Sequence, residues 1–431
     1  MIYHSRRVRG VASYHPTGVK KLDGIILYAI ITQMDKIDEI LDRGVDKIYP
    51  SKIALEKVLR SGKKIRLYQG FDPTGIQLHI GHLVGLMKLR QFQQLGHHVI
   101  FLIGDGTGQA GDPSGKTRSR EKFLKLNELR QNAKDYVLQA SKIINFESEN
   151  KAEILYNSDW LNKLNLVDLL DIAGHFTLQQ LEERDLYKER KKKGLDINMR
   201  EFMYPLLQGY DSVAMKIDLE IGGTDQTFNM LCGRQLVKQY LNTEKFVLTV
   251  PLLTDNKGNK IGKTEGNVIA LTAGPNDLYG MIMNLPDDVI VKCLTYVTDL
   301  PLSEINQIEN KLVSGDNPLI HKKRLAFELV RILNNQVDAQ KAQDFFVNTF
   351  QKKSYTGGFP EIKLQKLTEI NIIDFLVKLN LTESRAQAKR LVSQKAVDID
   401  NKMIDNVNFI VAPHDKMIIK VGKHKIVRLK L

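Results

Sequence analysis

The alternation of apolar and polar positions in the first half of the chain predicts a parallel α/β sheet. Residues 64–68 alternate as a half-buried strand does, whereas 98–104 (HVIFLIG) are almost all apolar, which is typical of a strand buried on both faces. Between them, residues 84–94 carry apolar side chains at helical spacing, and Gly96 is placed to end that helix. A strand, a helix and a second strand joined by a crossover of this length form a βαβ unit, whose strands are parallel.

Further elements follow from the same periodicities. Short strands are predicted at 153–156, 218–221 and 245–253. Helices are predicted at 53–59, 121–144, 164–173, 177–183, 200–215 and 227–239. The charged run 188–193 (KERKKK) is predicted to be a solvated loop, with contact to nucleic acid as the alternative.

The domain organisation follows from where these patterns change. We expect residues 34–267 to form a Rossmann-like parallel-sheet domain with a helical insertion at about 145–210. An α-helical domain at 268–352, a linker at 353–366 and a small α+β domain at 367–431 are expected to follow.

Residues 1–33 differ in composition from the rest. Five basic residues there face a single acid, and no small-residue cleavage site follows the short apolar run 24–31. Met34 then opens a cleaner amphipathic pattern. We expect Met34 to be the natural start and 1–33 to be an extension, with a transit peptide as the alternative.

Composition and charge narrow the class of protein. The chain has 431 residues, 42% hydrophobic and 26% charged, and no apolar run approaches the roughly 20 residues of a membrane span. Cys232 and Cys293 are its two cysteines, which argues against a disulfide scaffold and suits the cytoplasm. The net charge of +13 favours polyanionic partners, nucleic acid first, although a lysine-rich proteome explains it equally well.

His79 to His82 (HIGH) fall where a strand and loop pass into a helix N-terminus. Free N–H groups there favour anions, and Gly81 removes a side chain so that a flat ligand can approach the backbone. Phosphate and a nucleotide base fit this description. Two helix-capping histidines and a zinc pair are the alternatives, and zinc is weak because no third ligand lies at a recognised spacing.

Residues 104–117 form a glycine-rich turn after a predicted strand. Residues 106–111 match the spacing G-x-G-x-x-G, but a proline follows where the helix of a dinucleotide-binding motif should begin. A phosphate loop is also excluded, since its first glycine would be Ala110. In open α/β sheets this edge binds ligands. The turn carries three charged residues, Asp112, Lys116 and Arg120.

A polar stripe interrupts the helix predicted at 200–215. Tyr204, Gln208 and Asp211 are spaced i, i+4, i+7 and therefore share one face of an otherwise apolar helix. Buried polar groups need partners. The stripe is either a satisfied structural network or a site for a small polar ligand.

Two more segments carry candidate chemistry. The sequence GGTDQ at 222–226 is a second strand–glycine–helix corner, and its Asp225 is placed to accept ribose hydroxyls. Residues 256–267 contain three lysines and three glycines, and their composition predicts a solvated hairpin.

Near the C-terminus, phosphate contacts by basic side chains would give salt-dependent RNA affinity. These basic residues are Arg385, Lys389, Arg390, Lys395, Lys402, Lys416, Lys420, Lys423, Lys425, Arg428 and Lys430.

Taken in order, these motifs resemble those of bacterial-type tyrosyl-tRNA synthetases, a family of class I aminoacyl-tRNA synthetases, over about 34–431. The HIGH signature is unchanged, and KIGKT at 260–264 resembles the family's KMSKS loop. Tyr68, the polar stripe and GGTDQ resemble its tyrosine and adenylate site, and 367–431 resembles its S4-like RNA-binding domain.

The resemblance implies a tyrosine–tRNA ligase that activates L-tyrosine with ATP and transfers the tyrosyl group to tRNA(Tyr). The residues implied to act on the phosphates and ribose in catalysis are Thr74, His79, His82, Lys116, Arg120, Lys260, Lys263 and Thr264. Those implied to bind tyrosine are Tyr68, Asp112, Tyr204, Gln208, Asp211 and Gln226. Those implied to bind ATP are Asp72, Gly81, Gly223, Asp225 and Lys263, and those implied to bind RNA are Arg385, Lys389, Arg390 and Lys395.

The same resemblance implies the partners and the compartment. We expect tRNA(Tyr), tyrosine and ATP as substrates, Mg²⁺ carried by the ATP phosphates with no protein metal site, a homodimer, and a cytoplasmic enzyme without membrane contact. Gln69 and Glu220 depart from the residues common in the family, near the presumed ribose or substrate site. These two differences leave the ligand affinities at that site undetermined, but they do not change the expected reaction.

Three rival functions remain at this point. A tryptophanyl-type synthetase shares both signatures but lacks the polar stripe and the basic C-terminal domain. A non-catalytic RNA-binding paralogue would have lost residues of the tyrosine site, which are intact here. A dinucleotide-dependent oxidoreductase depends on the glycine spacing at 106–111 alone.

Overall fold

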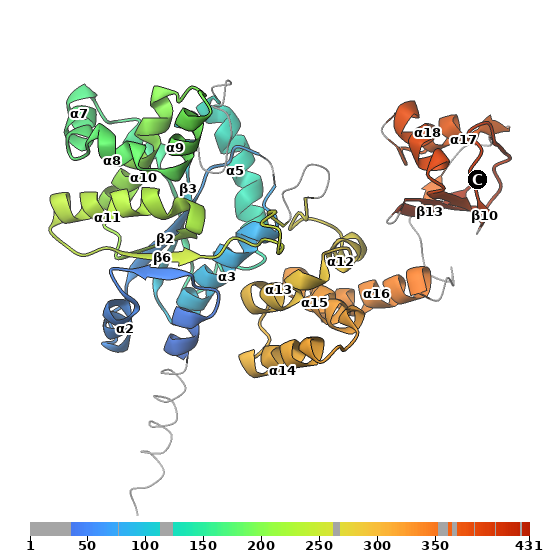
Figure 1. The fold of residues 1–431 in the computed structure, drawn as a ribbon, viewed down its shortest axis with the longest axis horizontal. Coiled ribbons are helices and arrows are strands. Elements are labelled where there is room, and N and C mark those ends of the chain that lie inside the picture. Colours follow the sequence, from blue (N-terminus) through green and yellow to red (C-terminus); the bar gives the residue numbers. More distant parts are fainter. Residues whose placement is uncertain are drawn as a thin grey trace, which may run out of the picture. The chain divides into compact units, whose positions relative to one another are not determined.

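The computed structural model describes residues 36–75, 77–112, 124–261, 268–351, 361–363, 369–382, 384–400, 402–422 and 425–431. The chain divides into two compact units (Figure 1). Unit 1 contains the described residues up to Gln77 and Gly81–Leu253, and unit 2 contains Leu78–Ile80 and the described residues from Thr254 on. The border after Leu253 lies earlier than the one expected after residue 267.

Unit 1 is built on a six-stranded sheet in the order β1-β6-β5-β2-β3-β4. Strand β1 pairs antiparallel with β6, and the other neighbours pair in parallel, as the βαβ pattern predicts. All residues of β3 after the first are buried, which agrees with its continuous apolar run. The strands are β1 (Lys47–Tyr49), β2 (Arg66–Phe71), β3 (His98–Ile103), β4 (Glu153–Tyr156), β5 (Leu219–Gly223) and β6 (Phe246–Val250).

Helices cover both faces of this sheet (Figure 1). Consecutive residues of β2 point to opposite faces: Tyr68 meets Ser212 on α10, whereas the amide of Gln69 lies so close to Gly85 on α3 that a Cβ there would be 2.2 Å from its Oε1. Helix α3 ends as predicted, with Gly96 at φ 78°. The helices are α2 (Lys52–Arg60), α3 (Ile80–Gln94), α4 (Thr107–Ala110), α5 (Leu126–Ala140), α10 (Met199–Ala214) and α11 (Thr227–Leu241), with the 3₁₀ turn η1 (Thr224–Gln226).

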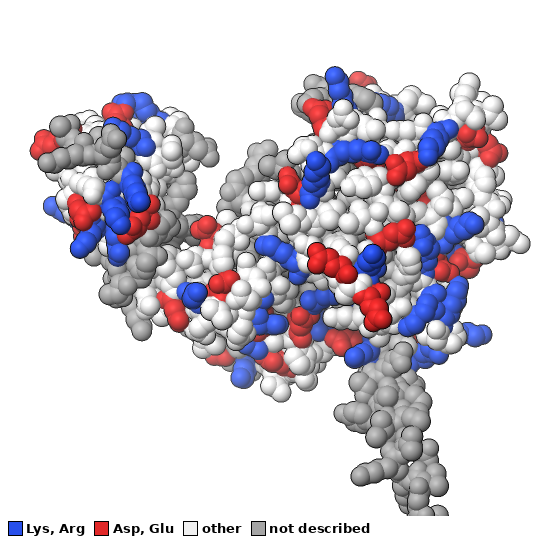
Figure 2. All heavy atoms as spheres, turned by 180° about the vertical axis from the view of Figure 1, so that it is seen from behind, with Lys and Arg blue, Asp and Glu red and all other residues white. Residues whose placement is uncertain are grey.

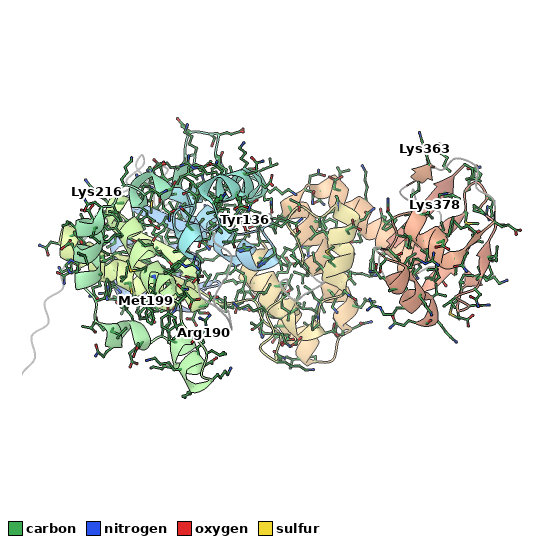
Figure 3. The ribbon with its side chains drawn as sticks, turned by 90° about the horizontal axis from the view of Figure 1, so that it is seen from above. Tyr136, Arg190, Met199, Lys216, Lys363 and Lys378 are labelled. Atoms are coloured by element: carbon green, nitrogen blue, oxygen red, sulfur yellow. The ribbon has the colours of Figure 1, made fainter. Side chains whose placement is uncertain are left out.

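A helical segment between β4 and α10 corrects one prediction. Its helices are α6 (Ser158–Leu161), α7 (Leu166–Gly174), α8 (Leu178–Glu182) and α9 (Asp185–Lys192). The charged run at 188–193 is therefore mostly helix and not a solvated loop. Arg190, labelled in Figure 3, is buried, and its Nη1 lies 2.6 Å from Oε2 of Glu201. A buried carboxylate partner offsets the cost of burying this cation. The charged run does not reveal this partner, because Glu201 lies outside it.

The first part of unit 2 is helical throughout, as predicted. It contains α12 (Pro275–Met283), η2 (Asp287–Val289), α13 (Ile290–Val297), α14 (Leu302–Val313), α15 (Pro318–Leu333), α16 (Gln336–Phe346) and the π-helical turn η3 (Val347–Gln351). Proline and asparagine begin α15: Oδ1 of Asn317 accepts from the N–H of Leu319, and Pro318 occupies the first helical position.

The C-terminal part of unit 2, residues 361–431, has a five-stranded sheet in the order β10-β9-β12-β13-β7 and a two-stranded pair β11-β8. Strand β7 pairs in parallel with β13. The folded part therefore begins inside the range expected to be linker, 353–366. The elements are β7 (Glu361–Lys363), β8 (Ile370–Asn371), α17 (Ile372–Lys378), α18 (Arg385–Ser393), β9 (Val397–Ile399), β10 (Lys402–Met403), β11 (Ile410–Val411), β12 (Ile418–Val421) and β13 (Lys425–Lys430).

This C-terminal part has an apolar core of its own, in which Phe375, Leu376, Ala388, Val392 and Ile419 are buried. Its charged side chains lie on the outside, where Figure 2 shows basic residues beside acidic ones. Among the described helices of the whole chain, none has the length and apolar character to cross a membrane.

Candidate functional site

A cluster of mostly buried polar side chains lies in unit 1 between the sheet and α10. In the parallel register Tyr68 of β2 is the partner of Glu220 on β5, so both side chains point to the face that α10 covers. The polar stripe of α10 faces them. This polar cluster comprises Tyr68, Asp72, Thr107, Asp112, Asn157, Trp160, Tyr204, Gln208, Asp211, Ser212, Glu220, Gln226, Asn229 and Lys245.

Asp211, the acid of the predicted stripe, has 1% of its surface exposed. Its Oδ1 accepts a hydrogen bond from Nε1 of Trp160 at 2.8 Å, and its Oδ2 accepts one from Nδ2 of Asn157 at 3.0 Å. Burial raises the pKa of this carboxyl well above its ordinary value, while the two hydrogen bonds lower it. Asn157 is itself held by the N–H of Gly106, which donates to its Oδ1 at 2.7 Å.

Tyr68 presents a neutral phenol next to this acid. Its hydroxyl lies 3.0 Å from Oγ of Ser212, the residue after Asp211, and its side chain is fully buried. Burial raises the pKa of Tyr68 well above its ordinary value, and the nearby Glu220 and Asp211 carboxyls raise it further. A buried phenol and a buried carboxyl thus lie at the same turn of α10. The phenol can donate and accept a hydrogen bond, and a carboxylate can only accept.

Tyr204, about two turns before Asp211 on α10, reaches the end of β2. Its hydroxyl donates to Oδ2 of Asp72 at 2.9 Å, and Oγ1 of Thr107 donates to Oδ1 of the same carboxylate at 2.7 Å. Burial raises the pKa of Tyr204 well above its ordinary value, with Asp72 and Asp112 adding to the effect. Asp72, expected at ATP, is therefore in direct contact with a residue expected at tyrosine.

A chain of amides joins the remaining predicted residues. Nε2 of Gln226 donates to Oδ2 of Asp112 at 2.8 Å, and Nδ2 of Asn229 donates to Oε1 of Gln226 at 2.8 Å and to Oε1 of Gln208 at 3.0 Å. Nη2 of Arg184 lies 3.7 Å from Oδ1 of Asp112. A carboxylate and two amide oxygens are brought together here, and such acceptors suit an ammonium group.

The HIGH segment passes from unit 2 into unit 1. His79 forms an antiparallel bridge with Ala270, and the N–H of Ile80 donates to the carbonyl of Ile269 at 3.0 Å. Ile269 and Ala270, which follow the predicted hairpin segment 256–267, therefore bond to the backbone at His79 and Ile80, where α3 begins. Because α3 begins at Ile80, His82 lies in its first turn as expected, with its ring centroid 6.2 Å from that of Phe71.

The other expected nucleotide contacts are distributed between both units. In unit 1, the N–H of Thr74 donates to the carbonyl of Asp72 at 2.7 Å, and a Cβ on Gly223 would come within 2.7 Å of Oδ1 of Asp225. In unit 2, Thr254 and Lys260 form an antiparallel bridge, so the predicted hairpin forms over the described part of that segment. Four expected residues lie outside the described residues, namely Lys116, Arg120, Lys263 and Thr264.

The sequence left a zinc pair at the two histidines as an alternative. The described residues contain no group of three His, Cys, Asp or Glu side chains arranged to hold a metal ion.

The predicted RNA-binding residues lie together in unit 2: Arg385, Lys389 and Arg390 are exposed on α18, and Lys395 follows two residues after the helix ends. Arg385 pairs with Asp374 of α17.

Sequence reasoning missed several members of the polar cluster. Asn157 directly follows the predicted strand 153–156, so the rule that singled out Asp112 at a strand's carboxyl end would also have found it. Thr107 lies after β3 in the same way. Lys245 carried no signal, because it is one lysine among many at the start of an apolar strand.

Comparison of the sequence and the fold with known proteins identifies the family. The family described as tRNA synthetases class I (W and Y) matches residues 60–351, and the tyrosine–tRNA ligase SYY-like C-terminal domain matches residues 351–428. The tyrosine–tRNA ligase of Thermotoga maritima is 39% identical over 393 residues, which cover 91% of this chain and 96% of that protein. That of Dehalococcoides mccartyi is 38% identical over 91% of this chain and 98% of its own length. A C-terminally truncated mitochondrial tyrosyl-tRNA synthetase of Aspergillus nidulans shares the fold with a TM-score of 0.64 at 23% identity, covering 76% of this chain and 100% of that one.

Proposed function

Because this chain belongs to the tyrosine–tRNA ligases among the class I synthetases, we propose that its polar cluster binds the tyrosine that the enzyme activates. The enzyme joins L-tyrosine to tRNA at the expense of ATP. Tyrosyl-adenylate and pyrophosphate form first, and the tyrosyl group then passes to the 3′ end of tRNA(Tyr).

The observation that supports this assignment is that Tyr68 and Asp211 are both buried at one turn of α10, where the Tyr68 hydroxyl contacts Ser212, the residue after Asp211. A phenolic hydroxyl supplies one donor and one acceptor. It can donate to the Asp211 carboxylate, and it can accept from Tyr68 once the Tyr68 hydroxyl turns its proton from Ser212 to the substrate. Phenylalanine has no hydroxyl and would form neither hydrogen bond, which is the established basis of discrimination in this enzyme class. Trp160 and Asn157 hold the carboxylate in place for this contact.

The opposite end of the cluster suits the amino group of the substrate. Asp112, Gln208 and the hydroxyl of Tyr204 provide acceptors for an ammonium, which has only donors. Gln226, bonded to Asp112, is proposed to lie close to the reacting carboxylate.

Activation needs no protein base, because the substrate carboxylate is already a nucleophile. It attacks the α-phosphorus of ATP, and the bond to the bridging oxygen breaks as pyrophosphate leaves. The protein contributes by positioning and by stabilising the charge that develops. The N-terminus of α3 favours anions, and ATP enters with Mg²⁺ on its phosphates. The residues proposed to bind the nucleotide and the leaving group are Thr74, His79, Gly81, His82, Lys116, Arg120, Gly223, Asp225, Lys260, Lys263 and Thr264.

The rest of the chain is proposed to bind tRNA and a second subunit. Helices at 268–352 would contact the anticodon end, and the basic α18 region would bind the variable arm. Four apolar side chains on α7 and at the start of α10 are more than 60% exposed and suit a homodimer contact, with Met199 labelled in Figure 3. They are Leu166, Val167, Leu170 and Met199. A cytoplasmic enzyme is the corresponding proposal for compartment.

Exchange of labelled pyrophosphate into ATP tests the function directly. We expect exchange with tyrosine and none with tryptophan or phenylalanine, followed by charging of tRNA(Tyr). Exchange stimulated by tryptophan and not by tyrosine would assign the chain to the other branch of its family. RNA binding without exchange for any amino acid would identify a non-catalytic paralogue.

A further inference from the structure

Lys245 is a fully buried cation for which the proposed reaction has no role. It is the residue immediately before β6, and none of its surface is exposed. Its Nζ contacts Oε2 of Glu220 on the adjacent strand, donates to the carbonyl of Met230 at 3.2 Å, and lies 6.0 Å from the ring centroid of Tyr68. The ammonium therefore lies directly beneath the phenol end of the polar cluster.

Glycines on α10 and α11 leave room for this ammonium. A Cβ on Gly233 of α11 would lie 2.4 Å from Nζ of Lys245 and 3.0 Å from Oγ of Ser212. A Cβ on Gly209 of α10 would lie 3.1 Å from the backbone nitrogen of Gly233. The helices can approach this closely, with the ammonium between them and the sheet, because both positions are glycine.

Three donors converge on the Glu220 carboxylate. Besides Lys245, Nε2 of Gln208 donates to its Oε1 at 2.9 Å, and Oγ of Ser212 lies 3.5 Å from its Oε2. A carboxylate only accepts, so the NH₂ of Gln208 must face Glu220 and its carbonyl oxygen must face the other way. That oxygen accepts from Asn229 at 3.0 Å and stays oriented to accept from a ligand ammonium.

We propose that Lys245 is a positioning residue for the amino-acid site, which through Glu220 orients the Gln208 amide and the Ser212 hydroxyl that meets Tyr68. This inference rests on the proposed function and adds to it a support for substrate affinity. Without the ammonium, Glu220 would be a buried acid with no counter-charge, which is costly enough to displace its carboxylate from its present contacts. Gln208 would then lose the partner that sets its orientation.

Pyrophosphate exchange by the full-length enzyme tests this with Lys245→Met and the double variant Glu220→Gln/Lys245→Met. Tyrosine-dependent exchange by the wild type is established first. Its absence would reject the proposed function, and the variants are informative only once it is present. The matched control is Lys238→Met, an exposed lysine on α11 that should leave all kinetic constants unchanged.

We expect Lys245→Met to raise KM for tyrosine about tenfold or more, with kcat and KM for ATP within about twofold of wild type. The double variant is a neutral pair with no buried charge, and the amide oxygen of the glutamine introduced at position 220 can still accept from Gln208. It should return KM for tyrosine to within about threefold of wild type.

Several outcomes would overturn the inference. These are an unchanged KM for tyrosine in Lys245→Met, an equal rise in KM for ATP and tyrosine together with a lowered Tm, or a double variant no better than the single one. If Lys245→Met does not fold, Glu220→Gln takes its place. That variant leaves the ammonium without its counter-charge and must raise KM for tyrosine more than the double variant does.

Discussion

The polar cluster of unit 1 and the C-terminal part of unit 2 handle charge in opposite ways. In the cluster, acids such as Asp211 and Glu220 are about 1% exposed, and each is held by two or three donors. At 361–431, charged side chains are mostly exposed and form simple ion pairs, as Lys395 does with Asp405 at 3.9 Å. Removing a charge from water is costly unless hydrogen bonds replace the lost hydration, whereas exposed pairs cost and contribute little.

This difference teaches what each region can recognise. A buried array of fixed donors and acceptors accepts one small ligand and rejects analogues that leave a group unpaired. An exposed basic surface binds a polyanion with little regard to its detail, and salt weakens that binding. Substitutions should therefore change substrate choice in unit 1 and the strength of tRNA binding in the C-terminal part.

The largest effect should come from the centre of the buried array. Asp211→Asn removes the acceptor proposed for the substrate phenol and turns an amide NH₂ toward Asn157 or Trp160. We expect kcat/KM for tyrosine in pyrophosphate exchange to fall about 1,000-fold, with KM for ATP unchanged. Asp135→Asn, at an exposed position of α5, is the matched control and should stay within about twofold. A loss below tenfold at Asp211 would remove this residue from the tyrosine site.

Removal of the exposed surface should leave the buried array working. A chain ending at residue 351 lacks the C-terminal sheet and its core. We expect charging of tRNA(Tyr) to fall about 100-fold or more in kcat/KM, while tyrosine-dependent exchange stays within about threefold. Parallel loss of both activities would contradict the separation of roles between the two regions.

A smaller change within that surface should alter salt dependence. Lys389→Ala/Arg390→Ala removes two exposed charges of α18, and for every phosphate that the variant no longer binds, the slope of log KM for tRNA against log salt should fall by about one. Exchange without tRNA should not change. Lys134→Ala/Lys151→Ala, two exposed lysines of unit 1, is the charge-matched control. An unchanged slope in the α18 variant would place the tRNA-binding surface elsewhere.

The smallest effect concerns acid stability, to which a buried imidazole makes unit 1 sensitive. Burial first, and then the charge of Lys64, lower the pKa of His97 to about 4. The unfolded chain binds this proton below its ordinary value of about 6.5, so stability is lost as pH falls from there toward 4. At pH 5 the loss should be about 2 kcal/mol relative to pH 7.

Urea unfolding at both pH values measures this loss. The comparison variant is His97→Gln, which keeps a polar group opposite the N–H of Ile65, bonded at 3.4 Å to Nδ1 of His97. Between pH 7 and pH 5, this variant should lose about 2 kcal/mol less of its free energy of unfolding than the wild type does. An equal acid loss in both proteins would mean that other groups cause it.

Local sequence patterns were sufficient to predict much of the secondary structure and the fold class of this protein. Spacing within a few residues predicts the βαβ core, the end of α3 at Gly96 and the common face of Tyr204, Gln208 and Asp211, because these properties depend on backbone geometry that repeats along one element. The two signature segments are equally visible, since their chemistry lies in consecutive residues. The expected fold and the family resemblance came from this information and are confirmed.

Only the tertiary structure decided the partners. Tyr204 meets Asp72 across 132 positions of sequence, and Lys245 meets Glu220 across 25, because parallel crossovers set distant strands side by side. For the same reason the sequence could not show that Arg190 would be buried against Glu201, or that 361–363 would pair with the last strand. Periodicity specifies which face of an element is buried, and strand order and helix crossing specify what that face meets.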